Sequence, residues 1–162
     1  MFIKQAELFW GLGHDFVEAV TNASRKEAFE ADRLLFAEGE PARRFYTLLS
    51  GRVNLTVGEE KRTVFSVSRA GESFGWSSLV GRNVYSATAR CIEPTRVIEI
   101  DGETFWSLCN RMPKDGMAFM RRLAGVLGHR LIASYEAAGR SGVGGDSVAM
   151  GTEQVLESLG EE

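Results

Sequence analysis

The feature that most constrains the fold is a series of short strand-like segments between about Lys26 and Ile100. They are rich in Val, Phe, Tyr, Thr and Leu, and Gly-bearing turns separate them. Alternation is clearest in the segment 52–57, where the apolar residues Val53, Leu55 and Val57 share one face. Many short strands at even intervals predict an antiparallel sandwich, jelly roll or barrel. The expected strands are Leu34–Phe36, Phe45–Leu49, Arg52–Val57, Arg62–Val67, Tyr85–Ile92 and Arg96–Ile100.

Helical patterns flank this region. In residues 5–20 an apolar stripe predicts two short helices divided at Gly11 and Gly13, with Asp15 as the cap of the second. Asp101 is a good N-cap for a short helix over 102–110, and Pro113 suits the first turn of a long helix over 113–138. One side of the long helix is expected to carry Met117, Met120, Leu123, Ala124, Leu127 and Leu131.

The 162 residues suit one domain with a sizeable core. We expect that domain to span 1–138 and to be mainly β with flanking helices. Its centre, at about 26–100, is expected to be an antiparallel jelly roll or double-stranded β-helix, as in cupins. The glycine-rich remainder, 139–162, predicts a flexible tail that ends in a short acidic amphipathic segment, Thr152–Leu159.

Composition excludes several classes of function. A formal net charge of −3 gives no overall attraction to nucleic acid or to anionic membranes. No apolar run approaches the roughly 18–20 residues of a membrane span, and the N-terminus lacks the pattern of a signal peptide. Cys91 and Cys109 make no disulfide framework, so we expect two reduced thiols, or one disulfide as the minor alternative, and a cytoplasmic location.

Enzymatic chemistry is not expected. A metal site on a cupin-like barrel needs two or three His and a carboxylate on neighbouring strands. The chain has only His14 and His129, and both fall on expected helices. The same shortage disfavours His-based acid–base or nucleophilic catalysis, and no Gly-x-x-x-x-Gly-Lys run is present. We therefore predict no metal, no cofactor and no enzymatic activity.

Two pairs of segments carry a resemblance to a known family. The first is Leu34–Ala42 followed by Phe45–Val53, and the second is Ala70–Gly75 followed by Ser86–Cys91. With the order helix, β-roll, short helix and long helix, they resemble the cyclic-nucleotide-binding domain family, whose β-roll is also that of catabolite activators. The resemblance covers about residues 7–136.

In that family one segment, Phe-Gly-Glu-Leu-Ala-Leu and then Arg-(Ala/Ser/Thr)-Ala, holds the nucleotide. The resemblance implies that Gly lets the backbone approach, Glu accepts from the ribose hydroxyl and Arg contacts the phosphate. Here Gly75, Ser86 and Ala87 match, whereas Trp76 replaces the Glu and Tyr85 replaces the Arg. Losing two charge-assisted contacts of about 1.5–3 kcal/mol each lowers affinity by about two to four decades. The candidate ligand-binding residues are Phe74, Gly75, Trp76, Ser77, Ser78, Arg82, Tyr85, Ser86 and Ala87.

Several roles in this segment stay open. Trp76 and Tyr85 either clamp a planar ligand or fill an unused pocket as core residues, and the second is favoured. Ser77 and Ser78 either present hydroxyls and amides to an anion or open a short helix. Arg82 either substitutes for the missing cation or is a solvated loop residue, which is favoured.

The resemblance implies a non-enzymatic regulatory or sensor domain, standing alone, that does not bind cyclic AMP or cyclic GMP in the usual mode and signals through a partner or a dimer. One alternative is a genuine receptor that uses Arg82 and backbone amides; another is a purely structural dimerising module. Relatives resembling bacterial transcription regulators pair their long helix, so a homodimer interface is expected at Met120, Leu123, Leu127 and Leu131. Residues after 138 are too few and too acidic for a DNA-binding domain, so an effector protein is expected.

Overall fold

The computed structural model describes residues 3–141. The chain divides into two compact units after Leu123. The long helix reaches Ser141, three residues beyond its predicted end at 138. The acidic segment Thr152–Leu159 lies outside the described residues.

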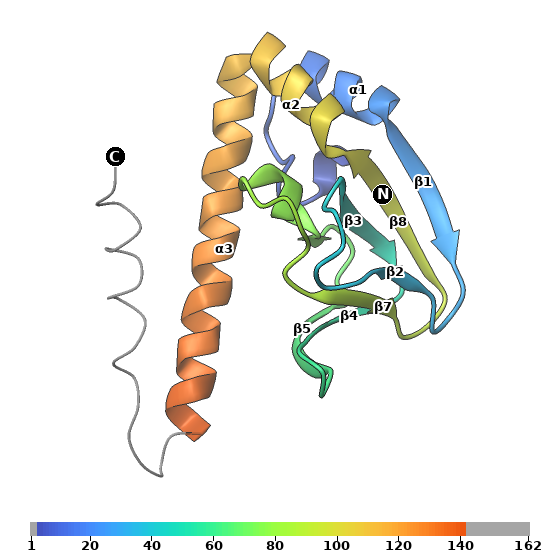
Figure 1. Cartoon of the computed structure of the whole chain (residues 1–162). Coiled ribbons are helices and arrows are strands. Elements are labelled where there is room, and N and C mark those ends of the chain that lie inside the picture. Colours follow the sequence, from blue (N-terminus) through green and yellow to red (C-terminus); the bar gives the residue numbers. More distant parts are fainter. Residues whose placement is uncertain (1–2, 142–162) are drawn as a thin grey trace. The chain divides into compact units, whose positions relative to one another are not determined.

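In the first unit the described strands form two four-stranded antiparallel sheets (Figure 1). The expected antiparallel fold, mainly β with flanking helices, is confirmed as a β sandwich or roll. One sheet has the order β1 (Ser24–Phe29), β8 (Thr95–Asp101), β3 (Arg44–Ser50) and β6 (Ser73–Phe74). The other has the order β2 (Leu34–Phe36), β7 (Thr88–Cys91), β4 (Val53–Val57) and β5 (Arg62–Val67).

Two strands carry little sequence signal of their own. Strand β1 reads Ser-Arg-Lys-Glu-Ala-Phe, and it exists because its backbone pairs with β8 from Ser24 opposite Ile100 to Phe29 opposite Thr95. Strand β6 has two residues, and both pair with β3. The strand expected at Tyr85–Ile92 begins only at Thr88. Tyr85 instead exchanges backbone bonds with the turn before β3, since its N–H donates to the Glu40 carbonyl at 2.9 Å.

The N-terminal helices differ from the prediction. Residues before Gly13 form a 3₁₀ turn, η1 (Ile3–Gln5), and then irregular turns, so the first of the two predicted helices is wrong. Helix α1 spans His14–Ala23 with Gly13 as its N-cap, and Asp15 lies inside the first turn without capping it. The Gly13 N–H donates instead to Asp115 Oδ1 at 2.7 Å, so a distant side chain satisfies the helix start.

Helices α2 (Gly102–Arg111) and α3 (Pro113–Ser141) begin where Asp101 and Pro113 predict. Asp101 Oδ1 accepts from the Thr104 N–H at 2.8 Å and from Thr104 Oγ1 at 2.7 Å. Helices α1 and α2 lie side by side against the first sheet (Figure 1).

A phenylalanine cluster joins the first turns of α3 to the rest of its unit. Phe9, Phe16, Phe45, Phe105 and Phe119 are fully buried, and the rings of Phe105 and Phe119 lie 4.5 Å apart between centroids.

Helix α3 faces the core with Phe119 and Leu123, whereas Met117, at the start of the predicted apolar stripe, is 65% exposed. Gly116 permits the tight contact between α2 and α3, since a Cβ there would lie 2.8 Å from Cys109 Cβ.

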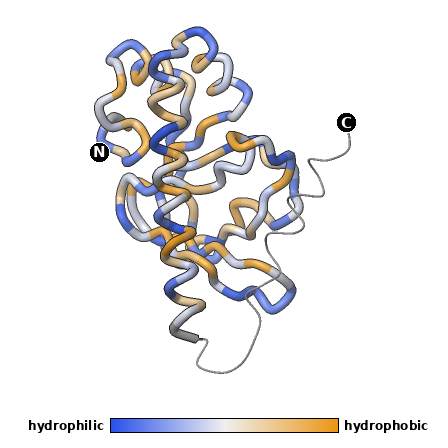
Figure 2. Tube along the Cα trace, turned by 90° about the vertical axis from the view of Figure 1, so that its left-hand side faces the viewer, coloured by the Kyte–Doolittle hydropathy of each residue, from blue (hydrophilic) through white to orange (hydrophobic). Residues whose placement is uncertain are grey.

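Hydrophobic and hydrophilic residues alternate along the trace in short stretches (Figure 2). Among residues 3–141, no helix combines the length and the apolarity needed to cross a bilayer.

Candidate functional site

The candidate segment starts at a glycine that no other residue replaces without strain. Gly75 follows β6 with φ +73°, a left-handed conformation, and opens the 3₁₀ helix η2 (Trp76–Leu79). A Cβ on Gly75 would lie 3.1 Å from Phe36 Cε1 and 3.1 Å from Tyr46 Cδ2. Both the backbone angle and the packing therefore require glycine at this position.

Tyr85 occupies the position where the resemblance implies an arginine, and it is 5% exposed. Its ring stacks on Phe36 with 3.8 Å between centroids and 14° between planes. Its hydroxyl donates to the Arg44 carbonyl at 2.8 Å and accepts from the Arg44 N–H at 3.2 Å. Burial raises the pKa of Tyr85 even though the Arg44 N–H lowers it. The residue is therefore a neutral, hydrogen-bonded core side chain.

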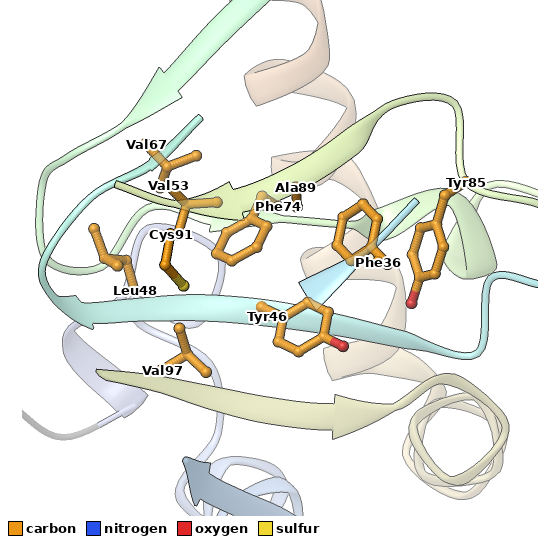
Figure 3. Close-up of a cluster of buried hydrophobic side chains, with 10 residues drawn as sticks. All are labelled: Phe36, Tyr46, Leu48, Val53, Val67, Phe74, Tyr85, Ala89, Cys91 and Val97. Atoms are coloured by element: carbon orange, nitrogen blue, oxygen red, sulfur yellow. The ribbon is translucent and has the colours of Figure 1, made fainter. Parts of the chain in front are cut away.

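Tyr85 belongs to a stack of aromatic rings inside the roll (Figure 3). Tyr46 stacks on Phe36 at 5.8 Å and on Phe74 at 5.2 Å. Burial is the main reason that the pKa of Tyr46 is raised, and neighbouring Tyr85 and Glu99 add to it. The aromatic stack, defined as Phe36, Tyr46, Phe74 and Tyr85, is continuous with the buried residues Leu48, Val53, Val67, Ala89, Cys91 and Val97.

The residues of η2 and the turn after it serve the local backbone. Trp76 is half-buried. Ser77 is buried, and its carbonyl accepts from the Val80 N–H at 3.3 Å and from the Arg82 N–H at 3.1 Å, which closes the turn. Neither Ser77 nor Ser78 caps η2, because the capping position is Gly75. The Ser78 carbonyl instead accepts from Trp106 Nε1 of α2 at 3.4 Å.

The predicted ligand-binding residues are not gathered in one place. Phe74 and Tyr85 belong to the aromatic stack, whereas Ser78 and Arg82 line a cavity outside that stack. Ser86 is exposed and Ala87 half-buried, both just before β7.

The cavity that contains Arg82 has a volume of about 510 Å³ and lies between the turn after η2, the start of β3 and the start of α2. We call it the η2–α2 cavity. Sequence reasoning missed most of its residues, since positions 43, 83, 103 and 106 share no motif and only the fold brings them together. Its lining is Ala42, Arg43, Ser78, Gly81, Arg82, Asn83, Asp101, Gly102, Glu103 and Trp106.

A smaller cavity of about 250 Å³ lies between α1, β3 and β8. Arg44 Nη1 and Glu99 Oε1 form an ion pair at 3.2 Å in its wall, and Asp101 borders it too. The charges of Arg44 and Glu99 therefore compensate each other within the wall of this cavity. In the part of the chain that is described, no three His, Cys, Asp or Glu residues are placed to hold a metal ion.

Both predicted thiols are buried and unbridged. Burial raises the pKa of Cys91, and it raises the pKa of Cys109 to about 11. Neither thiol is thus ionised near neutral pH, so neither has the character of a nucleophile.

The predicted dimer residues lie in different surroundings. Leu123 is buried within its own unit at 1% exposure, so it contributes to the core rather than to a free face. Met120 and Leu127 are half-buried, and Leu131 is 51% exposed. Leu127 and Leu131 thus remain available for an interface.

The chain combines two antiparallel sheets with a glycine that opens a 3₁₀ helix and a short helix after β8. Residues 26–112 match the model of the cyclic nucleotide-binding domain family. The chain belongs to this family.

Relatives and solved structures agree with that assignment. The chain is 27% identical to the cyclic AMP receptor protein of Thermus thermophilus over 132 residues, which are 80% of this chain and 59% of the relative. It thus spans about three fifths of that protein's length. The crystal structure of Thermus thermophilus catabolite activator protein superposes with a TM-score of 0.68 at 26% identity, covering 84% of this chain and 63% of the other.

A cyclic nucleotide-binding domain from Methylobacillus flagellatus KT superposes with a TM-score of 0.75. At 24% identity, over 89% of this chain and 82% of that one, this likeness shows the fold alone.

Proposed function

We propose that this chain is a non-enzymatic regulatory domain that has kept the family's fold but does not bind cyclic AMP or cyclic GMP in the family's usual mode. The observation that carries the proposal is Tyr85. At the position of the phosphate-binding arginine stands a ring that is buried, stacked at 3.8 Å on Phe36 and anchored to the Arg44 backbone. A neutral side chain with both hydrogen-bonding roles of its hydroxyl in use offers a cyclic phosphate no compensating charge.

The second anchor supports the same conclusion. Trp76 stands where the family has the glutamate that accepts from the ribose, and an indole N–H is only a donor. Losing both anchors lowers affinity by about two to four decades, since each charge-assisted contact contributes about 1.5–3 kcal/mol. A domain with such a pocket regulates through another ligand, through a partner protein or through pairing with a second copy.

Calorimetric titration with cyclic AMP and cyclic GMP tests the proposal. We expect no saturable heat at nucleotide concentrations up to about 1 mM, which corresponds to binding weaker than about −4 kcal/mol. A saturable micromolar dissociation constant at a one-to-one ratio would refute the proposal and support the alternative of a receptor with rearranged anchors.

Restoring the anchors gives the reciprocal test. The double variant Trp76→Glu/Tyr85→Arg should gain measurable cyclic nucleotide affinity, and Tyr85→Phe should not, since it keeps the ring and removes only the hydroxyl. Circular dichroism identifies the folded variants. If the double variant is folded and still does not bind, then the correspondence of Trp76 and Tyr85 to the family anchors is wrong.

A second candidate function is a purely structural dimerising module. Large apolar side chains are exposed on α3 beyond Leu123, with Leu131 at 51%, Ile132 at 56% and Tyr135 at 65%. Tyr135 follows Leu131 by four residues and Ile132 by three, a spacing typical of a helix that packs against another helix.

A further inference from the structure

The η2–α2 cavity lies outside the aromatic stack and takes no part in the anchor substitutions at Trp76 and Tyr85. Its volume of about 510 Å³ falls within the range of about 300–1,000 Å³ that small-molecule sites occupy. It joins the turn after η2 to the first turn of α2. The cavity shares only Ser78 and Arg82 with the predicted ligand-binding residues, so a ligand bound there is distinguished from a cyclic nucleotide by direct titration with both.

The walls of this cavity carry opposite charges on different segments. Arg43 and Arg82 come from the residue before β3 and from the turn after η2, and Asn83 also lines the cavity. Asp101 and Glu103 come from the start of α2. Within the described residues neither Arg82 nor Glu103 is in an ion pair. Both charges are thus available to a ligand.

Two backbone N–H groups at the start of α2 are already hydrogen-bonded within the protein. The Gly102 N–H donates to the Arg43 carbonyl at 2.8 Å and the Thr104 N–H donates to Asp101 at 2.8 Å. The start of the helix therefore leaves little to attract an anion, and the hydrogen bond from Thr104 is the main reason that the pKa of Asp101 lies below its usual range. Asp101 is accordingly negative at neutral pH, and the arginines are the groups that bind an anion.

Trp106 of α2 contributes an aromatic side chain to the lining of the cavity. Trp106 Nε1 donates to the Ser78 carbonyl at 3.4 Å, which ties the indole to η2 while the residue stays half-buried. Gly102 keeps the two segments close, because a Cβ there would lie 2.9 Å from Ser78 Oγ and 3.2 Å from the Arg43 carbonyl. Ser78 Oγ is buried without a hydrogen-bond partner among the described residues.

From this arrangement we infer that the η2–α2 cavity binds a small zwitterion of the free amino acid type. The carboxylate of the ligand lies at Arg82 and Arg43, because a guanidinium binds a carboxylate through two parallel hydrogen bonds. Its ammonium lies at Glu103 and Asp101, and its apolar side chain packs on the Trp106 indole. A ligand with only one charge leaves the opposite wall unpaired.

The inference is tested with the full chain and the twenty free L-amino acids, screened by thermal shift and then titrated by calorimetry. We expect saturable one-to-one binding of at least one apolar or aromatic amino acid. If L-phenylalanine binds, 3-phenylpropionate, which lacks the ammonium, and 2-phenylethylamine, which lacks the carboxylate, should each bind at least tenfold more weakly. The Trp106 indole N–H resonance should shift on binding, and the Trp106→Phe variant assigns that resonance.

Variants locate the site. Arg82→Ala and Glu103→Gln change exposed side chains and should each weaken binding at least tenfold. Arg62→Ala is the matched control, because Arg62 is also an exposed arginine, lies on β5 and does not line the cavity.

Three results overturn the inference. They are the absence of binding by every amino acid up to about 10 mM, binding that Arg82→Ala leaves unchanged, and binding of cyclic nucleotide that Arg82→Ala abolishes. The last would make the cavity a phosphate site and would contradict the proposed function as well. If neither amino acids nor cyclic nucleotides bind, this inference is wrong and the proposed function stands.

Discussion

At the scale of single residues, two positions determine the chemistry of the family segment. Gly75 forms the left-handed turn of the segment, and Tyr85 places a buried ring at the position where the resemblance implies an arginine. The backbone conformation of the segment and its ligand chemistry can therefore change independently, because the conformation depends on backbone angles and the chemistry on side chains.

Alanine at Gly75 separates backbone strain from packing. Gly75→Ala should cost about 1–2 kcal/mol for the left-handed conformation and about 1–3 kcal/mol more for overpacking against Phe36 and Tyr46. Gly58→Ala is the control, since Gly58 has the same φ of +73° and a Cβ there meets nothing within 4 Å. Urea unfolding of both variants gives the comparison. Equal losses would mean that the aromatic stack yields to the extra methyl group.

At the scale of elements, the junction between β8 and α2 connects the sheet to the helices. Asp101 is the last residue of β8, lies opposite Arg44 of β3 in the register of the sheet, and caps α2. The same residue borders both cavities.

Removal of this cap should be measurable and pH-dependent. Asp101→Ala should lower the free energy of unfolding by about 0.5–2 kcal/mol at pH 7. Because the folded pKa of Asp101 lies below its usual range, its contribution is present above about pH 4 and is lost as the pH falls through the folded pKa. Chemical denaturation at several pH values should therefore show the two proteins converging in acid. Asp101→Asn keeps an acceptor and should lose less; a loss as large as that of alanine would argue against the cap.

At the scale of the whole molecule, α3 belongs to both units. Up to Leu123 it is part of the phenylalanine core, through Phe119, and from Ala124 on it presents exposed apolar residues. In the second unit a Cβ on Gly125 or Gly128 would meet nothing within 4 Å, so these glycines leave room for a close partner.

The dimerising-module candidate predicts a mass of twice 17.8 kDa in light scattering. Leu127→Arg should reduce that mass to one chain, because a guanidinium is costly to bury in an apolar helix interface. His129→Arg is the control, since residue 129 is exposed and lies about 200° around the helix from residue 127. A monomeric wild-type protein, or an unchanged mass in Leu127→Arg, would reject pairing through this face.

The sequence by itself determined the features that depend on local backbone and capping preferences. Strands β2 and β5 have their predicted bounds, and Asp101 and Pro113 start α2 and α3 as their side-chain chemistry requires. Alternation, turn glycines and caps act over a few residues, so they can be read without knowing what lies nearby in space.

The tertiary structure alone decided what depends on distant partners. Strand β1 forms because β8 offers it an edge, and Gly13 serves as the N-cap of α1 with its N–H bonded to Asp115. The burial of Tyr85 needed Phe36 and the Arg44 backbone at its side, and the η2–α2 cavity needed residues from three segments. The long-range packing that produces such contacts leaves no periodic trace in the sequence, since each residue alone is compatible with several surroundings.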